Sequence, residues 1–70
     1  MMPLALTDAG TEQIVRKING KPEIKRHLED LGFVAGSPVT VVSSMRGNVI
    51  VMVKGIRVAI SEELARRIMV

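Results

Sequence analysis

Cysteine, aromatic residues and long hydrophobic runs are the scarce features of this sequence. With no cysteine, the chain can form neither a disulfide nor a thiolate metal site, which fits the reducing cytoplasm. One Phe and no Trp or Tyr leave it without platforms for stacking single-stranded nucleic acid and without an aromatic groove for proline-rich peptides. The longest purely apolar run, Val49–Val53, is far shorter than the roughly 20 residues that cross a bilayer. We expect a cytoplasmic protein that neither enters a membrane nor binds nucleic acid.

The length of the chain predicts one small domain, spanning residues 1–70. A chain of this size buries only about 60% of its unfolded surface, so its core is marginal, although 47% of the residues are hydrophobic. Ten Lys and Arg residues oppose seven Asp and Glu residues, giving a net charge of +3 with the signs interspersed. This mild bias permits an acidic partner surface without requiring one.

A helix is predicted between Pro22 and about Leu31. Proline suits the first helical turn, and Gly32 supplies the left-handed residue that ends many helices. Phe33 follows this glycine, and we expect the only aromatic side chain to fill the core beside the helix. Apolar residues recur at helical spacing and predict its buried stripe: Ile24, Leu28 and Leu31.

The segments on either side of this helix are predicted to be strands. Imperfect alternation over residues 12–18, with Ile14 and Ile18 expected on one face, predicts a single bent or edge strand. After the helix, a second strand covers residues 38–44 and opens with a proline, which the first position of a strand tolerates. Residues 44–48 are expected to form a loop.

A hairpin is predicted from Val49 to Ile60, turning at Lys54-Gly55. Ser61 is a good N-cap for a short helical turn, and residues 69–70 can return to extended structure and close a barrel. The predicted fold is therefore mainly all-β. It is a small, partly open barrel of about five strands, with one α-helix after the first strand and a short C-terminal helical turn.

In their order and spacing, five segments of the chain resemble the FeoA family of small accessory proteins of bacterial ferrous iron uptake. These segments are Ile14–Gly20, Leu28–Phe33, Ala35–Val39, Val49–Ile60 and the closing Ala59-Ile60-Ser61…Ala65…Ile68…Val70. The resemblance implies an SH3-like β-barrel. It also implies a partner, the membrane GTPase transporter FeoB, which the protein would contact on its cytosolic side.

The resemblance leaves a second function open. The same fold forms the C-terminal domain of iron-dependent repressors of the diphtheria-toxin-repressor type, so the alternative is a metal-responsive regulatory domain. Because no helix-turn-helix precedes the predicted barrel in these residues, we expect such a domain to stand alone. A nucleic-acid-binding barrel would show salt-dependent affinity, and the missing aromatic residues count against it.

Basic residues in and near the predicted hairpins are the candidates for partner binding. Arg46, Lys54 and Arg57 can form one patch facing an acidic partner surface, and Met52 offers an adaptable apolar contact beside them. The simpler interpretation of any one of these charges is ordinary surface solvation.

The predicted helix carries the only candidate metal ligands. Glu23, His27 and Asp30 fall at i, i+4 and i+7, on one side of the helix, and imidazole suits Fe²⁺ and Zn²⁺. The simpler interpretation is a solvated helix face, so we expect no required cofactor and at most a weak divalent ion. No nucleophile signature or glycine-rich phosphate loop accompanies these residues, and we expect a protein that is not an enzyme.

Overall fold

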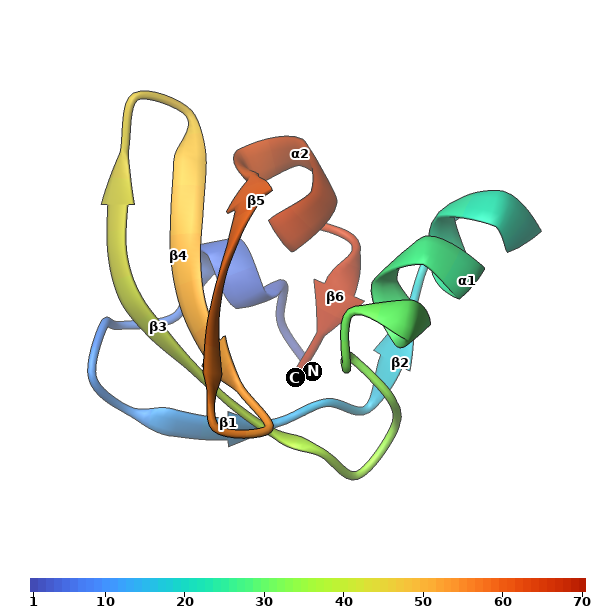
Figure 1. Cartoon of the computed structure of the whole chain (residues 1–70), viewed down its shortest axis with the longest axis horizontal. Helices are drawn as coiled ribbons and strands as arrows, with labels where there is room; N and C mark the ends of the chain where they lie inside the picture. Colours follow the sequence, from blue (N-terminus) through green and yellow to red (C-terminus); the bar gives the residue numbers. More distant parts are fainter.

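Strands dominate the computed structural model, which describes residues 1–70 (Figure 1). The elements in chain order are η1 (Leu4–Leu6), β1 (Glu12–Ile14), β2 (Lys17–Ile18), α1 (Pro22–Asp30), β3 (Pro38–Met45), β4 (Asn48–Val53), β5 (Ile56–Ser61), α2 (Glu62–Ala65) and β6 (Ile68–Met69). Antiparallel pairing gives one sheet in the order β1-β3-β4-β5 and a second formed by β2 and β6. The mainly-β prediction is confirmed, with six short strands in place of about five.

The single strand predicted over residues 12–18 is wrong, because the chain passes from one sheet to the other within it. β1 pairs with β3, whereas β2 pairs with β6. Between them the Val15 N–H donates to the carbonyl of Ser37 (2.9 Å) and the Arg16 N–H to that of Met69 (2.8 Å). The strand break moves Val15 into the core, while Ile14 is 42% exposed. Partners more than 20 residues away along the chain therefore decide which apolar residue is buried.

Two tight hairpins join β3, β4 and β5 into a meander. The turn at Lys54-Gly55 is confirmed, with φ angles of 50° and 78° that identify a two-residue turn of the type I′ class. The loop predicted at residues 44–48 is a second turn of the same kind. There β3 continues to Met45, and only Arg46 (φ 50°) and Gly47 (φ 82°) lie outside the strands. A register shift between Val41 and Ser43 marks a β-bulge in β3, which increases the local twist.

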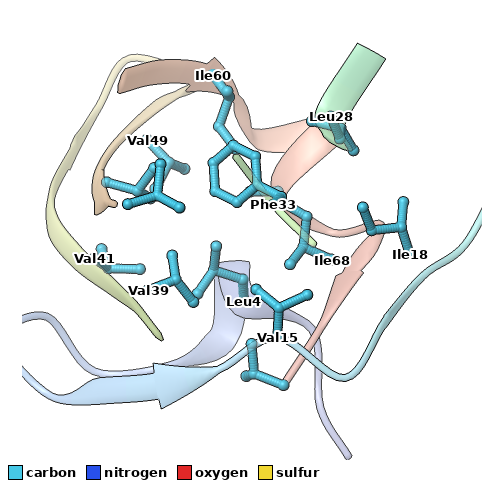
Figure 2. Close-up of a cluster of buried hydrophobic side chains, with 14 residues drawn as sticks. Leu4, Val15, Ile18, Leu28, Phe33, Val39, Val41, Val49, Ile60 and Ile68 are labelled. Carbon is cyan, nitrogen blue, oxygen red and sulfur yellow. The ribbon is translucent and has the colours of Figure 1, made fainter. Parts of the chain in front are cut away.

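Phe33 lies at the centre of the hydrophobic core and is fully buried, as predicted (Figure 2). Of the predicted helical stripe, Leu28 is fully buried, whereas Ile24 and Leu31 are half-buried at the edge of the core. The helix α1 is therefore anchored mainly through Leu28 and projects from the sheets (Figure 1). The remaining core residues are Leu4, Val15, Ile18, Val39, Val41, Val49, Val51, Val53, Ile60, Ala65, Ile68 and Val70.

The C-terminal segment closes the structure. The Ser61 hydroxyl caps α2 by accepting a hydrogen bond from the Leu64 N–H at 3.1 Å, as its sequence position predicts. Beyond α2, β6 pairs with β2, and the backbones of Met2 and Val70 exchange two hydrogen bonds of 2.9 Å each. The chain ends consequently lie side by side (Figure 1). None of the helices has the length and apolar character that crossing a bilayer requires.

Candidate docking surface

One end of the β4–β5 hairpin carries three of the four residues predicted to contact a partner. Met52 and Arg57 are direct cross-strand partners, and Lys54 occupies the turn between their strands. Arg57 and Lys54 are exposed, whereas Met52 is half-buried. We call Met52, Lys54 and Arg57 the hairpin surface. It places two cations beside a flexible apolar side chain, a combination that suits an acidic partner with some apolar character.

Arg46 lies apart from the hairpin surface. It occupies the β3–β4 turn, at the opposite end of β4 from Lys54. Six residues of β4 separate the two turns, which corresponds to roughly 20 Å at about 3.3 Å per residue. The structure therefore divides the single basic patch expected from the sequence into two, with Met45 exposed beside Arg46.

The cations of both turns and of β5 are free of intramolecular ion pairs. The structure contains two salt bridges, Arg66 to Glu62 at 2.6 Å and Arg67 to Glu63 at 4.0 Å, and both belong to the region of α2. Arg46, Lys54 and Arg57 take part in neither. Because no internal acid neutralises them, these side chains can meet acidic groups of another molecule without first breaking a contact.

The open edge of β5 is a feature that sequence reasoning missed. β5 is the last strand of the four-stranded sheet, and Ile56 at its start is 60% exposed. Strand order decides which strand has a free edge, and alternation within a segment carries no information on that order. The sequence identifies Arg57 only as an exposed charge. The structure places it on the edge strand of the sheet as well.

The candidate metal ligands on α1 do not assemble into a site. Glu23, His27 and Asp30 are all exposed, and they border a shallow surface hollow with no hydrophobic lining residue. Nowhere in the chain does a group of three or more His, Asp or Glu side chains gather where a metal ion could be held. A weak divalent ion at this helix stays a prediction.

Comparison with known proteins identifies relatives of the whole chain. The FeoA domain family matches residues 2–70. A protein of Methanocaldococcus jannaschii that carries the name Fe(2+) transport protein A is 39% identical over 70 residues, covering all of this chain and 85% of that protein. The similarity therefore extends beyond the fold to sequence along the full length.

Solved structures agree with this similarity. The crystal structure of an iron uptake regulatory protein, FeoA, has a TM-score of 0.88 at 35% identity, over 97% of this chain and 90% of that chain. The FeoA of Stenotrophomonas maltophilia, a prokaryotic SH3 domain protein crystallised with zinc, has a TM-score of 0.84 at 27% identity, over 99% and 88%. A manganese-dependent transcriptional repressor at 20% identity, of which this chain covers 38%, shares the fold alone. The predicted SH3-like fold is confirmed.

Proposed function

This chain belongs to the FeoA domain family, and we propose that it serves Fe²⁺ transport by docking on a FeoB-type membrane GTPase from the cytoplasmic side. The observation that carries the proposal is the family match over residues 2–70, joined by a full-length relative named for Fe(2+) transport. The hairpin surface supports docking as the means, because Lys54 and Arg57 are exposed and lack internal ion pairs.

The proposed mechanism is differential binding to the states of the transporter. A docked protein shifts a conformational equilibrium only when it binds one state more tightly than the other. A tenfold difference in affinity between nucleotide-loaded and empty transporter corresponds to about 1.4 kcal/mol. The chain needs no cofactor and turns over no substrate in this scheme, since binding alone does the work.

The test is a titration of the fluorescently labelled chain against the cytosolic GTPase domain of FeoB from the same organism. We expect saturable binding, with dissociation constants that differ at least fivefold between the GDP complex and the complex with a non-hydrolysable GTP analogue. Equal constants would remove the regulatory mechanism, and no binding would remove the partner.

A pair of charge reversals locates the contact. Arg57→Glu, on the hairpin surface, should weaken binding at least tenfold. Lys25→Glu changes the net charge equally but lies exposed on α1, so it should leave the affinity within a factor of two. Equal losses in the two variants would show that only overall charge matters.

A metal-responsive domain is the second candidate, favoured by the zinc-bound structure of the S. maltophilia relative. The residues of α1 do not fit a resident three-ligand site, so any ion would bind through His27 and few other groups. Titration with Zn²⁺ and Fe²⁺, followed at the His27 ring by NMR, should give a saturable shift that His27→Ala abolishes. A ring signal unchanged up to millimolar metal would end this candidate.

A further inference from the structure

We propose that β5 accepts an extended acidic segment of a partner protein as an additional antiparallel strand at the edge of the four-stranded sheet. Strand addition of this kind draws affinity from main-chain hydrogen bonds and specificity from alternate side chains. The identity of the partner rests on the function proposed above. The binding mode itself rests on the geometry of β5 alone.

The backbone of β5 presents hydrogen-bonding groups to solvent at alternate residues. A two-residue turn makes its flanking residues, Val53 and Ile56, a hydrogen-bonded pair. Six residues after Ile56, the Glu62 N–H donates to the Gly47 carbonyl at 2.8 Å. Because backbone groups alternate in direction along a strand, this bond lies on the same side of β5 as those of Ile56. Between Ile56 and Glu62, the residues whose backbone groups bond to β4 are therefore Val58 and Ile60.

Arg57 and Ala59 accordingly direct their N–H and C=O groups away from β4. No strand lies on that side of β5. Neither Arg57 nor Ala59 takes part in a backbone hydrogen bond to a turn, a loop or a helix end. These four groups form a ready template for another strand, which is the general property of an unprotected sheet edge.

Apart from the charge of Arg57, β5 lacks proline, a bulge and the other features of sequence and register that protect a sheet edge. Its six residues pair with β4 in an unbroken register, without a bulge, and the strand contains no proline. The opposite edge of the sheet is the three-residue β1, which offers a much shorter template. Arg57 is the only charged side chain of β5.

Side chains on the two faces of β5 define the chemistry of the added strand. Arg57 lies on the outer face with Lys54 at the adjoining turn, so an incoming strand gains most from acidic residues on this face. Ile56 and Val58, on the other face, are exposed and half-buried respectively, and they offer an apolar seat. The matching segment alternates acidic and apolar residues.

A second copy of the chain fits this edge less well. β5 has no acidic residue, so a second copy offers no opposite charge to Arg57 at this edge. Each copy also carries a net charge of +3, and the repulsion between two such copies opposes their association. The charge of the edge thus selects an acidic partner over self-association.

The probe for this proposal is a capped octapeptide in which Glu and Val alternate, with a Lys and Val octapeptide as control. We expect the Glu peptide to shift the amide signals of β5 in the NMR spectrum of the ¹⁵N-labelled chain. It should also slow hydrogen exchange of the Arg57 and Ala59 amides at least tenfold, while the Lys peptide does neither. Shifts confined to other elements, or none at millimolar peptide, would overturn the proposal.

Three variants separate backbone pairing from charge attraction. Ala59→Pro removes one outward N–H at an edge position, where proline is tolerated, and should abolish binding. Ala59→Val keeps the N–H and should bind the Glu peptide normally. Arg57→Glu leaves the backbone intact and should reverse the preference, so that the Lys peptide binds more tightly than the Glu peptide. This variant keeps the proposal testable if the proline variant fails to fold.

The remaining outcomes decide between occupants and between proposals. Self-association of the free chain in sedimentation, lost in Ala59→Pro, would assign the edge to a second copy and overturn the acidic partner. Peptide binding at β5 without any binding of the FeoB GTPase domain would sustain the strand-addition mode and remove the proposed function. If Ala59→Pro leaves the binding of the GTPase domain unchanged, the proposed function is sustained and the strand-addition mode is removed.

Discussion

Truncation of Leu28 to alanine probes how α1 is attached to the barrel. Leu28 is fully buried, and the other two apolar residues of the helical stripe are half-buried. A Leu→Ala change in a core costs about 2–5 kcal/mol, through the lost transfer free energy and the cavity left behind. At about 0.05–0.15 kcal/mol per residue, a chain of 70 residues has a free energy of unfolding of roughly 4–10 kcal/mol. Leu28→Ala therefore removes a large part of the total.

Urea unfolding followed by circular dichroism measures this loss of free energy directly, and thermal unfolding followed by the same signal measures the fall in melting temperature. A change of 1 kcal/mol moves the melting temperature of a domain this size by about 4–8 °C, so Leu28→Ala should lower it by at least roughly 8 °C. Leu6→Ala is the matched control, because Leu6 is 67% exposed and its truncation should cost less than about 0.5 kcal/mol. A Leu28→Ala loss no greater than that of the control would refute the packing described for α1.

Substitutions at three further positions test local geometry, each by the same urea unfolding assay. Gly32→Ala should cost about 1–2 kcal/mol, because φ is +111° there and a Cβ strains such a conformation; a neutral result would contradict the left-handed helix end. Ser61→Ala should cost about 0.5–2 kcal/mol by removing the cap of α2, and Ser61→Asp should retain most of it. Lys54→Asn should stabilise the chain by up to about 1 kcal/mol, since Asn tolerates the positive φ of the turn, and destabilisation would count against a turn of the I′ type.

Local signals were sufficient for the elements whose causes are local. Pro22 and Gly32 bracket α1, Lys54-Gly55 turns the hairpin, and Ser61 caps α2, and each depends on residues within one turn of itself. Arg46-Gly47 carries the same turn chemistry as Lys54-Gly55. The sequence pattern predicts a longer loop there, because Ser44 and Met45 lack the apolar alternation of the first half of β3.

Long-range pairing set the parts that local signals missed. The segment breaks between β1 and β2 because its first half pairs with β3 and its second half with β6. Residues 12–18 alone do not indicate that the two halves have different partners. Long-range pairing also divides the basic patch that the sequence predicts. The register of β4 and β5 brings Met52 to Arg57, whereas Arg46 lies at the far end of β4. The free edge of β5 needs the strand order of the whole sheet.

Hydrogen exchange of the chain bound to the FeoB GTPase domain tests the central claim most directly. If the transporter docks by adding a strand to β5, the Arg57 and Ala59 amides, which point to solvent in the free chain, should exchange at least tenfold more slowly in the complex. Amides exposed on α1, such as that of Glu23, should keep their rates. Protection of α1 with unchanged exchange at Arg57 and Ala59 would contradict the account.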